Sequence, residues 1–115
     1  METYIATLYA KKGHEDEVAA FYSGLTRDVE GLEERTVFRA SDGRFAALVR
    51  EKLPPGADGP PHGHGPQGTH FIVLERWRSA DDRIAYSMQP ETRAENMKVI
   101  PHLLPEHTHE LYDQV

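Results

Sequence analysis

The stretch HFIVLERW, at residues 70–77, limits the possible folds more than any other part of the chain. Most of it is apolar, and it is rich in the β-branched and aromatic residues that strands prefer. A strand with a nearly continuous apolar run is usually covered on both faces, so we expect it to lie in the middle of a sheet. The rest of the chain must therefore supply its neighbouring strands.

Four other segments are predicted to be strands. TYIATLYAKK (3–12) is short and rich in β-branched and aromatic residues, and RTVFRA (35–40) alternates between polar and apolar residues. The turn sequence SDG then leads into RFAALVREKL (44–53), a second strand that we expect to form either a hairpin or one bulged ribbon with 35–40. THELYDQV (108–115) is predicted to form the last strand.

Two helical regions are also expected. Residues spaced by three, four and seven positions give the first region an apolar face, and Gly31 is a plausible stop; these residues are Val18, Phe21, Tyr22, Leu25, Val29 and Leu32. The second region begins at a capping-box pattern of Ser79 and Asp82. Pro90 interrupts it, and a further helical piece runs from about residue 91 to 104, where Pro105 closes it.

The predicted order, β-α-β(β)-β-α-β, is that of a ferredoxin-like α+β fold, an antiparallel sheet with helices on one face. A length of 115 residues suggests a single domain, 1–115, with a loop rich in proline, glycine and histidine at about 54–69. Apolar residues make up 38%, which is low for a self-sufficient small domain. We therefore expect a homodimer.

Charge and composition exclude several classes of function. A formal net charge of -6 and the lack of a basic patch argue against a nucleic-acid partner. The absence of cysteine excludes disulfides, thiolate catalysis and cysteine-type zinc sites. Without a signal-peptide pattern at the start or an apolar run of membrane-spanning length, we expect no membrane association and a cytoplasmic location.

The stretch FIVLERWRSADDRIAYSMQPE, with KKGHEDEV after the first strand, resembles the antibiotic biosynthesis monooxygenase family, whose members are dimeric α+β barrels. The matching features are a glycine after the first strand, an E-x-W at the end of a central strand, a polar helix start and a proline at the break between helices. In this chain they are Gly13, Glu75 with Trp77, Ser79 to Asp82, and Pro90.

This resemblance implies a monooxygenase that uses O2 on a polycyclic aromatic substrate, a polyketide-type phenol, anthrone or quinone. It implies no tightly bound cofactor, with reduced flavin (FADH2 or FMNH2) as a possible co-substrate. Many members carry a histidine nine residues after the tryptophan, where this chain has Tyr86. The three residues of the haem-degrading branch are replaced by Ala6, Tyr86 and Asn96, so haem degradation is not expected.

Such chemistry needs a base, donors that hold an oxyanion, and an enclosed pocket. His70 begins the central strand and is the candidate base, and Trp77 and Tyr86 are the candidate catalytic pocket residues. Core packing is an equally good explanation for Trp77. The loop is interpreted as a lid over the pocket. The predicted substrate-binding residues are His62, His64, Met88 and Asn96.

Two other functions remain open. An aromatic polyketide cyclase could use the same fold, and a metal-binding module could use the H-x-H pairs at 62/64 and 107/109. Short histidine motifs in a glycine loop are weak metal signatures, so no metal is expected. His107 and His109 are expected to pack at a dimer interface, and His14 is assigned no function.

Overall fold

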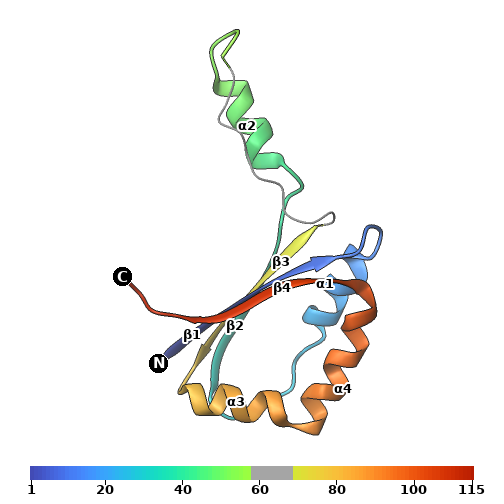
Figure 1. Cartoon of the computed structure of the whole chain (residues 1–115), viewed down its shortest axis with the longest axis vertical. Coiled ribbons are helices and arrows are strands. Elements are labelled where there is room, and N and C mark those ends of the chain that lie inside the picture. Colours follow the sequence, from blue (N-terminus) through green and yellow to red (C-terminus); the bar gives the residue numbers. More distant parts are fainter. Residues whose placement is uncertain (58–68) are drawn as a thin grey trace.

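The computed structural model describes residues 1–57 and 69–115. Within these two ranges, four strands and four helices follow one another, with one short 3-10 turn before the last strand (Figure 1). In order they are β1 (Glu2–Ala10), α1 (Glu15–Ser23), β2 (Leu32–Arg39), α2 (Arg44–Lys52), β3 (His70–Trp77), α3 (Ala80–Met88), α4 (Pro90–Val99), η1 (Ile100–His102) and β4 (Leu103–Tyr112).

The four strands form one antiparallel sheet in the order β2-β3-β1-β4. The predicted strand at 70–77 has the predicted limits and is central, with β2 on one side and β1 on the other. This order confirms the ferredoxin-like α+β fold. The sheet does not close on itself, so a single chain forms an open sheet rather than a barrel.

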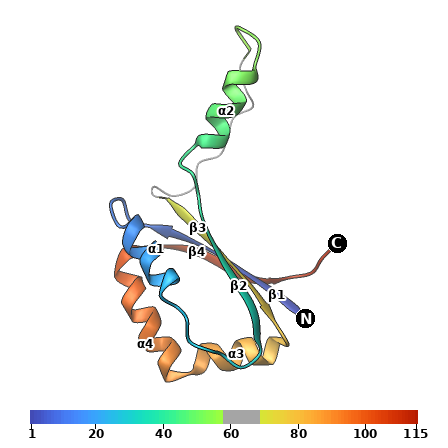
Figure 2. The ribbon, with the colours of Figure 1, turned by 180° about the vertical axis from the view of Figure 1, so that it is seen from behind.

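Helices α1, α3 and α4 cover one face of the sheet (Figures 1 and 2), as predicted. Along β3 the side chains at 71, 73, 75 and 77 are buried on this helix-covered face, while His70 and Arg76 are exposed on the other. Strand geometry imposes this alternation, because successive side chains point to opposite faces. A small apolar core of Ala10, Val18, Phe71 and Val99 joins the sheet to α1 and α4.

The predicted start and break of the second helical region are confirmed. The Ser79 hydroxyl accepts a hydrogen bond from the Asp82 backbone N–H at 3.1 Å, which caps α3. Gln89 is extended (φ -67°, ψ 137°) and Pro90 is the first residue of α4. Proline suits this position because the first turn of a helix has no partner for its N–H.

The prediction of a strand at 44–53 is wrong, because this segment contains helix α2. Phe45, Leu48 and Val49 are spaced by three and four, which is a helical period. None of the residues of α2 is buried, and the helix projects away from the body of the molecule (Figure 1). In the chain, α2 follows β2 and precedes the loop at about 54–69. The strand that pairs with β2 is therefore β3, and the predicted pairing of 35–40 with 44–53 does not form.

Two further boundaries differ from the predictions. Helix α1 ends at Ser23 with Gly24 as its cap, and the chain continues through a non-helical segment to Gly31 (φ +84°) before β2. Strand β4 begins at Leu103 and contains Pro105, because an edge strand can accept a residue without an N–H.

Among the described residues, no helix is both long and apolar enough to cross a bilayer.

Candidate functional site

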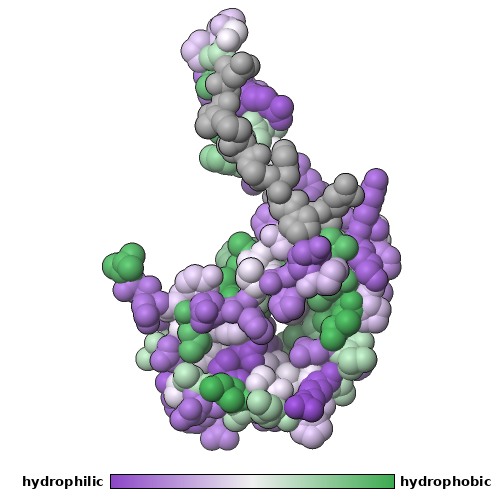
Figure 3. All heavy atoms as spheres, in the orientation of Figure 1, coloured by the Kyte–Doolittle hydropathy of each residue, from purple (hydrophilic) through white to green (hydrophobic). Residues whose placement is uncertain are grey.

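A cavity of about 1010 Å³ lies between the sheet and the helices and opens to solvent. Figure 3 shows the hollow in the body of the molecule, below the projecting α2. Its apolar lining comes from α1 and the residues just after it, the end of α4 and the start of β4, and includes Phe21, Leu25, Val99, Leu103 and Leu104. This volume is large enough for a flat ligand of several fused rings.

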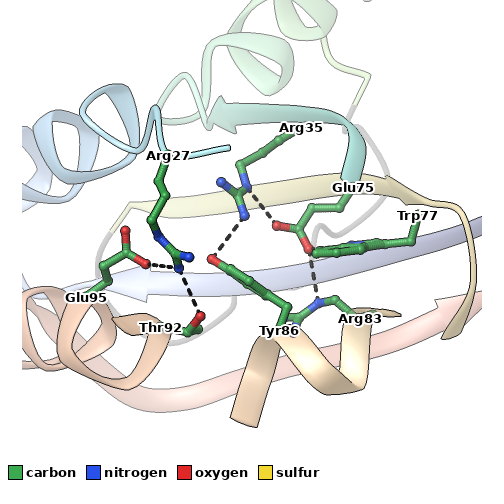
Figure 4. Close-up of polar contacts among 8 residues, drawn as sticks. All are labelled: Arg27, Arg35, Glu75, Trp77, Arg83, Tyr86, Thr92 and Glu95. Atoms are coloured by element: carbon green, nitrogen blue, oxygen red, sulfur yellow. Dashed lines mark hydrogen bonds and ion pairs between the residues drawn. The ribbon is translucent and has the colours of Figure 1, made fainter. Parts of the chain in front are cut away.

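Glu75 of β3 is the centre of the polar wall of this cavity (Figure 4). Its side chain is 4% exposed and lies opposite Arg35 in the pairing of β2 with β3. One carboxylate oxygen accepts from Arg35 Nε at 2.7 Å, and the other accepts from Trp77 Nε1 at 3.0 Å. Arg83 Nε lies 3.1 Å from the second oxygen, close enough for an ion pair but not aligned for a hydrogen bond.

Tyr86 of α3 extends this network to the cavity surface. Its hydroxyl oxygen accepts a hydrogen bond from Arg35 at 3.1 Å, so its own proton is free to be donated to another acceptor. Its ring lies 5.3 Å from the Trp77 ring, and the guanidinium groups of Arg27, Arg35 and Arg83 all lie within 5.7 Å of its centre. The hydroxyl is therefore well placed to stabilise a negative oxygen.

Two more tyrosines line the cavity, Tyr4 and Tyr22. Burial raises the pKa of Tyr22, with smaller contributions from neighbouring tyrosine and glutamate side chains. Burial also raises the pKa of Tyr4, although the Arg83 guanidinium 4.0 Å above its ring opposes the shift. Both hydroxyls therefore stay protonated at neutral pH and act as donors, not as bases.

Arg35 remains a cation in this setting. Burial would lower the pKa of its guanidinium, but the charge and hydrogen bond of Glu75 outweigh this effect and raise the pKa. A third arginine near Tyr86, Arg27, comes from the segment after α1 and reaches across to α4. It donates to Glu95 at 2.7 Å, to Thr92 at 3.1 Å and to Gln89 at 3.1 Å (Figure 4). These contacts join the segment after α1 to α4, next to the Tyr86 ring.

The structure places some of the predicted site residues at the cavity and others away from it. Tyr86 and Asn96 line the cavity. Trp77 is fully buried behind the lining, where its indole N–H is bound to Glu75, which is closer to core packing than to direct contact with a ligand. Met88 is 62% exposed and lies outside the lining, where its sulfur accepts from Arg93 at 3.9 Å.

His70 lies on the opposite face of the sheet from the cavity, beside Tyr9 (ring centres 6.0 Å apart). The sheet separates it from Tyr86, so its predicted role as base has no geometric support within one chain and stays a prediction. His62 and His64, with most of the predicted lid, lie outside the described residues. In the described ranges, no three His, Asp or Glu side chains are grouped so as to hold a metal ion.

Sequence reasoning missed the cavity-facing role of His107 and His109, and of Arg35 and Arg83. The pairing of β4 with β1 places His107 opposite Leu8 and His109 opposite Ala6, two residues that line the cavity. For the arginines a signal existed: Glu75 is a charge in an apolar strand, and a buried charge requires a partner of opposite sign.

No protein-family model matches this chain, and no curated protein sequence is significantly similar to it. Solved structures are similar in fold. One named as an antibiotic biosynthesis monooxygenase has a TM-score of 0.68 at 19% identity, over 100% of this chain and 99% of the other. A candidate monooxygenase of this type from Deinococcus radiodurans has a TM-score of 0.67 at 13% identity, over 100% and 93%.

A third neighbour is a dimeric protein of unknown function with a ferredoxin-like fold from Bacteroides fragilis. It has a TM-score of 0.62 at 11% identity, and 98% of this chain and 95% of the other are covered. At such identities the comparison establishes the fold, because one fold can carry many chemistries. The resemblance seen in the sequence is thus confirmed at this level: the chain has the fold of structures named as antibiotic biosynthesis monooxygenases.

Proposed function

We propose that this protein is a monooxygenase that oxidises a polycyclic aromatic phenol, anthrone or quinone of the polyketide type with O2. The observation that carries the proposal is the arrangement of Tyr86 and Arg35 on the wall of a roomy, largely apolar cavity. Apolar walls hold fused rings, and the Tyr86 hydroxyl offers its proton to an oxygen of the substrate. Neighbours named as monooxygenases share the fold.

The chemistry needs little beyond these groups. Oxidation of an anthrone CH2 to a quinone carbonyl by O2 releases one water, and the substrate itself supplies all four electrons. One oxygen atom enters the carbonyl and the other leaves in the water. The protein must promote ionisation of the substrate and hold its oxyanion, which are tasks for a base and for hydrogen-bond donors. Reduced flavin would be required as a co-substrate only for a substrate that cannot supply these electrons.

We also propose that the functional unit is a homodimer. The face of the sheet without helices carries apolar side chains, among them Ile5, Ile72 and Leu74, and Phe38 is 53% exposed there. A second copy would cover this face, which water would otherwise contact. One structural neighbour is described as dimeric.

Oxygen uptake by the purified protein with an anthrone or a naphthacenone tests the proposed activity. We expect uptake and incorporation of one atom from 18O2 into the product. Replacing Tyr86→Phe should reduce kcat, and Met88→Leu, outside the cavity lining, should not. Absence of protein-dependent oxygenated product, both with and without reduced flavin, would exclude the oxygenase. Conversion of a polyketide substrate without O2 would instead support the aromatic cyclase that the sequence leaves open.

A further inference from the structure

The two histidines of β4 are the imidazoles that line the cavity within the described ranges. His107 is paired with Leu8, and side chains directly opposite each other on neighbouring strands lie on the same face of a sheet. Leu8 itself lines the cavity, so the His107 ring is on the cavity side. His109 has the same orientation one pleat further along, and the two rings meet edge to face at 5.5 Å.

The contact of His107 with Pro105 fixes its protonation pattern. Nδ1 lies 2.9 Å from the Pro105 carbonyl oxygen, which can only accept a hydrogen bond. Nδ1 therefore carries the hydrogen, and in the neutral ring the lone pair is on Nε2. A histidine held through one nitrogen by a third group, with the other nitrogen free, has the arrangement of a general base. Within the described contacts, neither nitrogen of His109 is held in this way.

We propose that His107 is the general base of this cavity and that it acts on an ionisable hydroxyl of a fused-ring phenol or anthrone enol; the assignment rests on the proposed function. Tyr4, Tyr22 and Glu75, which also line the cavity, are poor candidates. Tyr4 and Tyr22 are half-buried and remain protonated. Both carboxylate oxygens of Glu75 are engaged by Arg35, Arg83 and Trp77.

The base and the oxyanion donors come from different walls, since His107 belongs to β4 and Tyr86 to α3. In the proposed step, His107 Nε2 takes the proton from the substrate hydroxyl. The O–H bond breaks, an N–H bond forms, and the electron pair stays on the substrate as a phenolate. In a hydroxyanthrone this charge is shared with a carbonyl oxygen further along the rings. The substrate class that fits is therefore a fused-ring molecule with a hydroxyl at one end and a conjugated carbonyl directed at Tyr86.

The test separates ionisation from oxygenation by working without O2. The probe is 3-hydroxyanthrone, whose hydroxyl is conjugated with the carbonyl across the ring and whose anion absorbs at longer wavelength than the neutral form. The decisive variant is His107→Asn, because the asparagine amide can still donate to the Pro105 carbonyl but has no group in the place of Nε2. The control variants are Thr108→Asn, the next residue of β4, which is paired with Thr7 outside the cavity lining, and His70→Asn, the base expected from sequence, on the opposite face of the sheet.

We expect the wild-type protein to bind and ionise the probe at neutral pH, and His107→Asn to bind it with a Kd within about threefold but to leave it neutral. In air, kcat for oxygen uptake should fall about 100-fold or more in His107→Asn, in the range of general-base contributions, with little change in KM. Both controls should ionise the probe as the wild type does.

The assignment is overturned if His107→Asn ionises the bound probe normally, if either control abolishes ionisation, or if the wild-type protein fails to bind or ionise the probe. Ionisation by the wild type without oxygen uptake has a different meaning. It would retain His107 as the base and reject the oxygenase, so the two proposals can fail separately. Far-UV circular dichroism of each variant confirms that a lost signal is not a loss of fold, which we do not expect at an exposed position of β4.

Discussion

Replacing Glu75→Gln should destabilise the protein more than any other single exchange of a carboxylate for an amide among the described ion pairs. The change keeps the size and one acceptor oxygen but removes the negative charge. Arg35 and Arg83 would then face each other at the polar wall without compensation, with side chains only 12% and 18% exposed. Uncompensated buried charges are costly, since little water is present to screen them.

The magnitude follows from burial. Breaking a buried ion pair by removing one partner costs about 3–5 kcal/mol. Because both arginines retain some solvent contact, we expect the low end, about 3 kcal/mol. For a domain of this size, about 4 °C of Tm is lost per kcal/mol, which gives a fall of about 12 °C. Against a typical total stability of about 5–15 kcal/mol, this is a large fraction.

Glu95→Gln is the matched control. The Glu95–Arg27 pair has the same N–O distance as the Glu75–Arg35 pair, 2.7 Å, but its side chains are 22% and 33% exposed. Solvent screening should limit its loss to about 1 kcal/mol or less. Urea unfolding followed by circular dichroism, at equal protein concentrations, measures both variants. If Glu75→Gln costs no more than Glu95→Gln, burial does not set the strength of these pairs and the reasoning on the polar wall is refuted.

Three further perturbations test other parts of the fold. Gly31→Ala should cost about 2 kcal/mol or more in urea unfolding, because Gly31 has φ +84° and a Cβ there would lie 2.6 Å from the Asp82 side chain; an unchanged midpoint would contradict this. Burial raises the pKa of Tyr22, so its contribution to stability is complete below about pH 10, the ordinary tyrosine pKa, and is lost as pH rises through the higher folded value. Tyr22→Phe should therefore flatten the fall in Tm above pH 10, and an equally steep fall would reject it. Phe45 and Leu48 of α2 are 75% and 46% exposed, so replacing both with serine should change the stability of an isolated chain by less than about 0.5 kcal/mol, and a large loss in thermal unfolding would show that α2 is covered.

Sequence predicted best where the signal is local and strong. The apolar run of β3 gave its limits, and Ser79 and Pro90 gave the start of α3 and the break before α4. Each of these signals acts through the backbone of its own segment, through a missing N–H or a capping hydroxyl. The prediction at 44–53 failed because an apolar residue every three or four positions was given less weight than the preceding turn at SDG.

The polar wall could be predicted only in part. Glu75 in an apolar strand indicates that a cation must lie nearby, but its partner Arg35 is 40 residues away in the chain. The identity of that partner depends on the register of β2 against β3, in which the two residues are directly opposite. A shift of one residue would turn Arg35 to the other face, and local sequence does not determine such a register.

The same rule of alternation decides which histidine can act in the cavity. His70 directly precedes Phe71, and Phe71, Val73, Glu75 and Trp77 all lie on the helix-covered face. His70 must therefore point to the other face, and no rotamer carries its ring through a hydrogen-bonded sheet. His107 is opposite Leu8 and is on the cavity side by the same geometry. A catalytic His70 would thus require a second cavity on the open face of the sheet, formed with another copy of the chain, and Tyr86 could not serve both.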